Sequence, residues 1–222
     1  MLKVESIVDS ARKYLETCIF SGEYKPGQQV KEQEVASSLG ISRPPIREAF
    51  KILEAEGFLR REPRRGVFVS DLTGVDIWEI YTLKIALYSL AVTLAIDKMS
   101  DADFGRLERI VKEMEAIILR PGKKDILKYE DLNHLFHETT AEIAGHGRLR
   151  KIQQSLNNQA KRIAVGSFSD PKHLKESCKY HRKILEAVKA RDKELAEQLT
   201  REHILKGLDI QEELFRKKGR SF

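Results

Sequence analysis

Cysteine is scarce in this chain of 222 residues, which has only Cys18 and Cys178, far apart and without metal-ligand spacing. This excludes a disulfide framework and fits a reducing cytoplasm. Long apolar runs are also lacking. No segment approaches the roughly 18 uninterrupted apolar residues that a membrane span requires, and the N-terminus has no apolar signal core. We therefore expect a cytoplasmic protein with no membrane partner.

Low-complexity linkers and internal repeats are not evident either, and 41% of the residues are hydrophobic and 33% charged. This is the composition of an ordinary folded chain, long enough for one large or two modest domains. The formal net charge of +6 is compatible with a polyanionic partner but does not require one. The positions of the basic residues carry more information than their number.

Two short apolar helix faces separated by a glycine predict a helix-turn-helix. Val35, Ala36 and Leu39 form the first face, and Gly40 can turn the chain. The second face has apolar residues at i, i+3, i+4 and i+7, namely Ile46, Ala49, Phe50 and Leu53. Packing this face inward places Arg47, Lys51 and Glu54 on the outer side of the second helix, where a DNA groove would be read. A further helix over residues 3–21 is expected to pack behind this pair.

After Gly57 the apolar period changes from that of a helix to that of strands. Residues 58–61 and 67–69 read as two strands joined by residues 62–66, which form a wing with a basic tip. Residues 43–65 contain seven basic side chains against four acidic ones. The alternative interpretation is a basic face that contacts only solvent.

From residue 74 onward every long segment has helical periodicity. Helices are expected near residues 74–99, 101–119, 124–144, 147–165, 171–190 and 192–215. Connections this short predict a compact, mostly antiparallel bundle of about six helices. The expected fold is therefore mostly α, with a winged helix-turn-helix domain in residues 1–72 and an all-helical domain in residues 73–222.

All six histidines lie in this helical half. Asn133 and His137 are one turn apart on a face that continues into small residues, so both side chains can reach one point. His181 and His203 continue apolar rows on their own helices and are therefore expected to face inward. Buried histidines need polar partners, which singles out these positions as a candidate site.

The N-terminal motifs resemble those of a known family. They are Glu34-Val35-Ala36, Leu39-Gly40-Ile41-Ser42-Arg43, Pro45-Ile46-Arg47-Glu48-Ala49, Leu53-Glu54-Ala55-Glu56-Gly57 and Pro63-Arg64-Arg65-Gly66. They are similar to the GntR family of transcriptional regulators, in the subgroup named after FadR that has a helical FCD effector-binding domain. The resemblance extends over essentially the whole chain. It implies a homodimer that binds a palindromic operator in double-stranded DNA.

The resemblance also implies roles for individual residues. Arg43 and Arg47 are expected to read bases, and Ser42 to contact the DNA backbone. Arg65 and Gly66 at the wing tip are expected to approach the minor groove. Pro44 departs from the family pattern, which has Thr there. If Pro45 is the first helical residue, then Pro44 is the N-cap and lacks a capping oxygen, which is typically worth about 1 kcal/mol, and operator preference can change as well.

Metal-binding FCD domains have one Asp and three His, and the spacing of Asn133, His137, His181 and His203 looks like that pattern. Asn133 departs from it, because an amide oxygen can coordinate a cation but brings no negative charge. Three neutral imidazoles suit a divalent transition metal such as zinc or nickel. Three interpretations stay open: a metal completed by an anionic ligand, an anion bound without metal, or structural polar residues.

The remaining effector-binding residues follow the family less closely. Where the family has an Arg and, four residues later, a Glu, this chain has Lys84 and Tyr88. Lys84 can neutralise a carboxylate but cannot form the planar bidentate contact of Arg. Arg162 is a further candidate anion contact, whereas His146 is not assigned a ligand role.

We therefore predict a ligand-responsive transcriptional regulator, most often a repressor, with a small organic acid as effector. It is not expected to be an enzyme. One alternative is a metal-dependent hydrolase fused to a DNA-targeting module, because three histidines with an open position can activate water. Neither Glu138 nor Glu130 is placed as its acid or base. The other alternative is an architectural DNA binder whose helical domain serves only for dimerisation.

Overall fold

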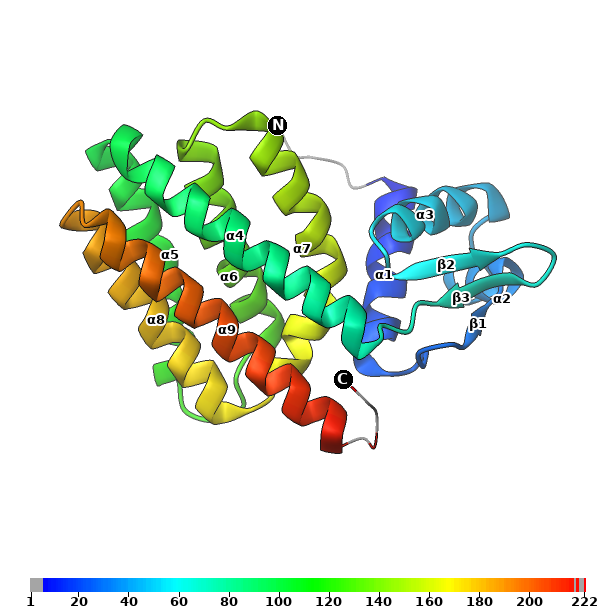
Figure 1. Cartoon of the computed structure of the whole chain (residues 1–222). Coiled ribbons are helices and arrows are strands. Elements are labelled where there is room, and N and C mark those ends of the chain that lie inside the picture. The colour runs from blue at the N-terminus through cyan, green and yellow to red at the C-terminus, as the bar shows by residue number, and fades with distance from the viewer. Residues whose placement is uncertain (1–5, 218, 220–221) are drawn as a thin grey trace. The chain divides into compact units, whose positions relative to one another are not determined.

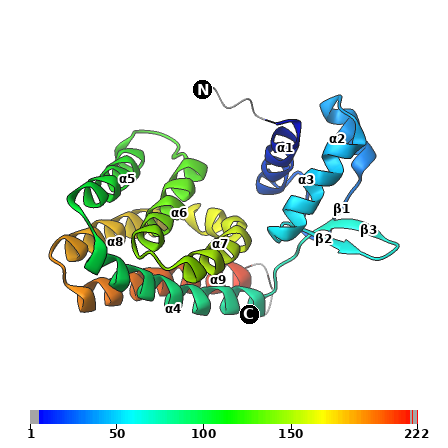
Figure 2. The ribbon, with the colours of Figure 1, turned by 90° about the horizontal axis from the view of Figure 1, so that it is seen from above.

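The computed structural model describes residues 6–217, Gly219 and Phe222. The described residues form nine α-helices and three β-strands (Figures 1 and 2). They divide into two compact units, one ending at Leu72 and the other beginning at Thr73.

The N-terminal unit combines three helices with a small antiparallel sheet. Its helices are α1 (Ile7–Ser21), α2 (Glu32–Leu39) and α3 (Arg43–Ala55), and its strands are β1 (Gln29–Val30), β2 (Leu59–Glu62) and β3 (Gly66–Val69). The strand order is β1-β3-β2, and the β2–β3 hairpin projects from the helices as a wing (Figure 2). The helix-turn-helix and the wing were expected, whereas β1 was not.

Apolar periodicity and glycine caps explain the shape of this unit. Ile46, Ala49, Phe50 and Leu53, the face identified in the sequence, are completely buried. Gly40 ends α2 in the left-handed conformation with φ of 64°, and its N–H is bonded to the carbonyl groups of Ala36 and Ser37. A side chain is disfavoured in that conformation, so Gly40 makes the tight turn between the two helices possible.

The C-terminal unit is a bundle of six helices among the described residues, as expected. They are α4 (Gly74–Lys98), α5 (Asp101–Leu119), α6 (Ile126–Ile143), α7 (Gly147–Phe168), α8 (Pro171–Lys189) and α9 (Lys193–Lys217). Thr73 with Asp76, and Ser100 with Asp103, form capping boxes that start α4 and α5. In the view of Figure 1, α4 and α9 run side by side across the bundle, and α8 packs against α9.

Helix α4 is long and apolar enough to span a membrane by length and composition alone. Half of its most apolar stretch is buried among the other helices of the bundle, and core helices of soluble proteins meet the same criterion. Its inner face carries large buried side chains such as Ile77, Tyr81 and Tyr88. The packing therefore accounts for the apolar character of this side of the helix.

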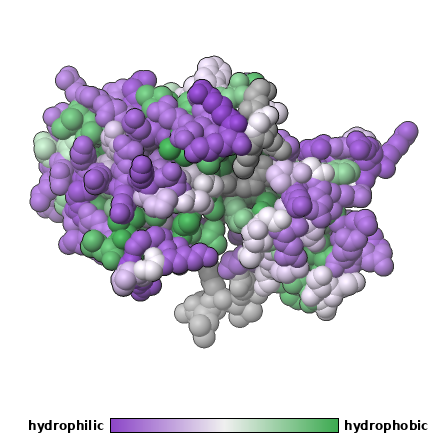
Figure 3. Space-filling view, turned by 90° about the horizontal axis from the view of Figure 1, so that it is seen from below, coloured by the Kyte–Doolittle hydropathy of each residue, from purple (hydrophilic) through white to green (hydrophobic). Residues whose placement is uncertain are grey.

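The face of the molecule drawn in Figure 3 is mostly hydrophilic, with smaller hydrophobic patches between the polar side chains.

Candidate DNA-binding surface and candidate metal centre

Helix α3 begins two residues earlier than expected from the sequence. Arg43 is its first residue and Ser42 is the N-cap, so the assignment of Pro44 as the N-cap is wrong. A capping oxygen accepts from the second or third N–H of a helix, and here Pro44 and Pro45 have none. Ser42 accordingly makes no side-chain capping bond. The residue at the N-cap therefore has a hydroxyl oxygen, and Pro44 affects the cap only by lacking an N–H group that this oxygen could accept from.

The two arginines expected to read bases are exposed and meet at one carboxylate of α2. Arg47 Nε donates to Glu32 Oε2 at 2.8 Å, and Arg43 Nη2 donates to the same oxygen at 3.4 Å. Partial burial raises the pKa of Glu32, but the Arg47 hydrogen bond and the two positive charges outweigh it and lower that pKa. Glu32 is therefore an anionic anchor for both arginines, a role that was not predicted from the sequence.

The tip of the wing is held by Gln29 of β1. Gln29 Nε2 donates to the carbonyl oxygen of Arg65 at 2.7 Å. Gly66 has φ of 114°, and a Cβ atom there would lie 2.6 Å from Gln29 Nε2. The backbone conformation thus favours glycine at this position, whereas the close approach could be relieved by a shift of the flexible end of the Gln29 side chain. The guanidinium groups of Arg60 and Arg65 each lie 5.5 Å from the Phe68 ring centroid.

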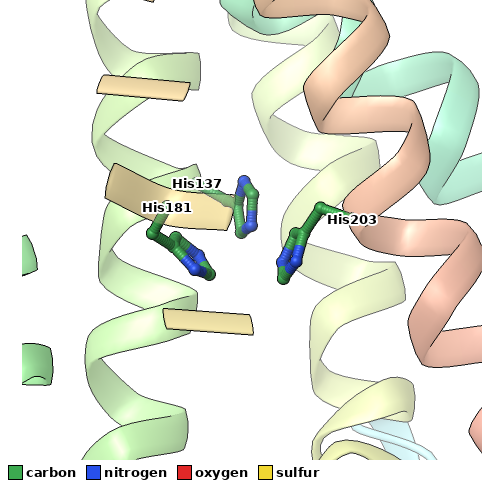
Figure 4. Close-up of side chains that lie close together, drawn as sticks. All are labelled: His137, His181 and His203. Atoms are coloured by element: carbon green, nitrogen blue, oxygen red, sulfur yellow. The ribbon is translucent and has the colours of Figure 1, made fainter. Parts of the chain in front are cut away.

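In the helical unit, three of the histidines singled out in the sequence come together. His137 of α6, His181 of α8 and His203 of α9 are all buried, and their rings converge (Figure 4). Their candidate ligand atoms all lie within 4.8 Å of one another. Three nitrogens bound to one tetrahedral zinc are about 3.4 Å apart, so small side-chain rotations would bring the three imidazole nitrogens to the spacing that a metal requires.

Burial keeps the three imidazoles in the neutral form that binds metals. It lowers the pKa of His181 to about 4. Burial and the neighbouring imidazoles also lower the pKa of His137 and His203 well below 6.5. His181 Nδ1 lies 2.8 Å from the carbonyl oxygen of Ser177, which can only accept, so Nδ1 carries the proton and Nε2 has a free lone pair.

Unpaired polar atoms around the cluster provide a test of whether a metal fits. His181 Nε2, His203 Nδ1 and Asn133 Oδ1 are buried without a hydrogen-bond partner in the described structure. Such groups are costly to bury unless something binds them. Two imidazole nitrogens and an amide oxygen are all metal ligands, so the residues present fit a divalent cation.

Asn133 is oriented by a residue to which the sequence assigned no role. Its Nδ2 donates to Glu130 Oε2 at 2.7 Å, and both side chains are buried. Glu130 lies one turn before Asn133 on α6, and that spacing was the only signal in the sequence. Which face of α6 is directed into the bundle depends on the tertiary fold. The buried contact between Glu130 and Asn133 therefore could not be predicted from their spacing alone.

The cavity beside the cluster contains the predicted Lys84 and Tyr88 of α4. It has a volume of about 30 Å³ and is also lined by Asn133, His137 and His173. Burial lowers the pKa of Lys84, and the charge of Glu130 partly offsets this. Tyr88 donates from Oη to Asn157 Oδ1, a partner that was not predicted.

The other candidate residues are less informative. The side chain of Arg162, the third predicted effector contact, lies outside the described residues. His146 is the N-cap of α7, where its Nδ1 accepts from the N–H of Leu149 at 3.3 Å. A cap is a structural role, in keeping with its exclusion from the ligand set.

Both units match known families. Residues 7–69 match the model described as bacterial regulatory proteins, gntR family, and residues 79–206 match the FCD domain. The HTH-type transcriptional regulator YdhC of Bacillus subtilis is 34% identical over 184 residues, which cover 83% of this chain and 81% of that protein. The chain belongs to the GntR family of transcriptional regulators.

Other GntR-family relatives agree with this assignment. The probable D-xylose utilization operon repressor of Paenarthrobacter nicotinovorans is 27% identical, with 90% of this chain and 86% of that protein covered. The gluconate operon repressor of Bacillus subtilis is 33% identical over 62% of this chain and 55% of that protein. The solved structure of McbR/YncC from E. coli has the same fold, with a TM-score of 0.78, 21% identity and coverage of 95% of this chain and 99% of that one.

These findings settle the class of this GntR-family protein. It has a DNA-binding domain and an FCD domain, and its relatives are transcription regulators rather than enzymes. The prediction that it is not an enzyme is confirmed. The hydrolase alternative is unsupported, because neither the family models nor the relatives reported above point to an enzyme.

Proposed function

We propose that this GntR-family regulator is a repressor that binds a palindromic operator as a homodimer and responds to a small carboxylate held at a metal centre. The observation that carries the proposal is the convergence of three buried, neutral histidines beside a buried lysine. A structural role alone would leave two of the buried imidazole nitrogens, His181 Nε2 and His203 Nδ1, unsatisfied in the described structure.

The proposed metal ligands are His137, His181, His203 and the amide oxygen of Asn133. A zinc or nickel ion bound there supplies a Lewis-acidic positive charge. Because the four ligands are neutral, that charge attracts an anion to any remaining coordination position. Lys84 adds a second positive group in the same cavity, and Tyr88 is a neutral donor there because burial raises its pKa well above 10.

The size of the cavity suggests how a signal arises. A volume of about 30 Å³ accommodates an ion and water but not an organic acid. Binding an acid must therefore displace side chains or helices that line the cavity. Lys84 and Tyr88 belong to α4, the first helix after the DNA-binding domain in the chain, so displacement of α4 is a direct route to that domain.

An unpaired apolar face on α4 supports the homodimer. Val75, Trp78, Leu83 and Leu90 have exposed fractions between 45% and 61% and recur on the outer side of the helix. Apolar patches of this kind are common at subunit interfaces. A second copy of α4 would bury the same residues on both sides, as two-fold symmetry requires. Two recognition helices related in this way would match half-sites about one helical turn apart.

The test combines metal analysis with ligand-dependent stability. The purified protein, before and after chelation, is assayed for metal content and for thermal stabilisation by a panel of carboxylates. Sugar acids lead the panel because one relative represses a gluconate operon. We expect near-stoichiometric metal and stabilisation by an acid that chelation abolishes. H181Q should lose both, whereas H134Q, which replaces a partly exposed histidine on α6, should keep them.

Other outcomes separate the alternatives. Stabilisation by an acid that chelation leaves unchanged would replace the metal with direct binding by Lys84 and the histidines. If no acid stabilises the protein or alters its binding to DNA selected from a random pool, the effector proposal fails and the architectural alternative gains support.

A further inference from the structure

The departure of Asn133 from the family's aspartate is accompanied by a buried carboxylate next to it. Glu130 accepts a 2.7 Å hydrogen bond from Asn133 Nδ2, and the two residues are only 5% and 7% exposed. A carboxylate oxygen in this contact accepts, so the amide must present its NH₂ group to Glu130. The amide oxygen therefore points away from Glu130.

The position of Asn133 determines what its free oxygen can reach. Asn133 is one helical turn from His137 on α6, and both line the cavity that also contains His203. Asn133 Oδ1 is buried without a hydrogen-bond partner in the described structure. Rotating the amide by half a turn would place its NH₂ group toward the site, where it could not coordinate a cation.

We infer that Glu130 is a positioning residue of the metal centre, which holds the Asn133 oxygen toward the histidines and supplies the negative charge that Asn133 lacks. This inference rests on the proposed function, because it requires a metal at the cluster. Glu130 and Asn133 together do what one aspartate does in the family pattern: the amide provides the oxygen and the glutamate provides the charge. Partners behind metal ligands commonly contribute about 10–100-fold to affinity.

The charge balance of the cavity supports this division. The four proposed ligands are neutral, and Lys84 adds a positive charge to the same cavity. Glu130 interacts electrostatically with Lys84, Tyr81 and Tyr88, so its charge acts on the cavity as a whole. Without the charge of Glu130, a divalent cation would lie beside the ammonium group of Lys84, and neither residue 130 nor residue 133 would provide a negative charge to balance the two.

The experiment is a double-mutant cycle on metal affinity. Zn²⁺ and Co²⁺ dissociation constants are measured by chelator competition for the wild type, E130Q, N133D and the double variant E130Q/N133D. E130Q should weaken binding by about 10–100-fold. N133D in that background should restore most of the affinity, because the introduced carboxylate carries its own negative charge.

The cycle should be strongly non-additive. With Glu130 intact, N133D places two carboxylates at hydrogen-bonding distance, where like charges oppose each other, so it should change affinity little. The gain from N133D should thus be about tenfold larger in the E130Q background. Equal gains in the two backgrounds would overturn the inference.

Controls separate this role from a merely structural one. E138Q removes a charge from the same helix at a side chain that accepts from Gln154 and Arg150 instead, and should leave metal affinity unchanged. E130Q should alter the Co²⁺ absorption spectrum, and thermal unfolding in excess chelator reports whether it also affects the metal-free fold. An unaltered dissociation constant and spectrum in E130Q would overturn the inference. If the wild type binds no metal, the proposed metal centre itself fails.

Discussion

At the scale of single residues, Glu32 holds the two arginines that are predicted to read bases. Its carboxylate binds Arg47 and Arg43, which orients their guanidinium groups but also offsets their charge. A phosphate must compete with Glu32 for the same donors. The fixed orientation of the guanidinium groups strengthens contacts with base edges in the proposed operator. Non-specific contacts with phosphates are strengthened only by the positive charge.

E32Q should therefore raise the affinity for random duplex DNA at low salt. It should also reduce the ratio of operator affinity to random-DNA affinity. Surface ion pairs of this kind are worth up to about 1 kcal/mol, so a several-fold change is expected. Fluorescence anisotropy with a random duplex and a duplex selected by the wild type provides both affinities. The matched control is E34Q on the same helix, because Glu34 pairs with Lys31. If the two variants behave alike, Glu32 has no special role.

At the scale of secondary-structure elements, α4 has two different faces. The inner face carries Lys84 and Tyr88 into the cavity, and the outer face presents Trp78 and Leu83 to solvent within the described unit. Exposing a tryptophan and several aliphatic side chains on one helix is unfavourable unless another surface covers them. The proposed dimer provides that surface.

W78E should therefore shift the protein from dimer toward monomer and weaken operator binding, because a monomer engages only one half-site. Sedimentation velocity over a range of concentrations measures the first effect. I152E is the control, since Ile152 of α7 is about as exposed, at 52% against 53% for Trp78, but lies on another helix. Dissociation by both variants, or by neither, would contradict an interface on this face of α4.

How far the sequence predicted the structure also depends on the element. Periodicity sufficed for the helices and the wing, because an apolar face of several turns is a long signal. It missed β1, whose two residues are too few to show a period, and it began α3 too late because paired prolines obscured the start. The three histidines could be selected by inward spacing, but Glu130 could not, since its contact depends on side-chain packing within the bundle.

At the scale of the whole molecule, the buried histidines couple folding to pH. Their pKa values are lowered in the folded state, to about 4 for His181, whereas unfolded histidine titrates near 6.5. Below pH 6.5 the unfolded chain thus binds more protons than the folded one, so stability falls as pH falls toward 4 and is fully present above 6.5.

Metal-free protein should lose about 1.4 kcal/mol of unfolding free energy per pH unit for each such histidine over this range. Urea denaturation in chelator at about pH 7, 6 and 5 measures the slope. H181Q should reduce the slope, because it removes one of the titrating groups, whereas H134Q serves as the control. A slope unchanged by H181Q would mean that this imidazole is not buried neutral in the folded protein.

The proposed regulation imposes a stricter condition on the molecule as a whole. If an acid weakens operator binding by a given factor, linkage requires the operator to weaken binding of the acid by the same factor, typically about 5–150-fold. Calorimetric titration of the acid into free protein and into the operator complex measures one factor, and operator binding with and without saturating acid measures the other. K84M should weaken binding of the acid in both forms of the protein, because Lys84 supplies positive charge to the cavity in each. Two unequal factors would show that the acid also acts on another equilibrium, such as dimerisation. If both factors equal one, the acid does not affect operator binding and is excluded as an effector.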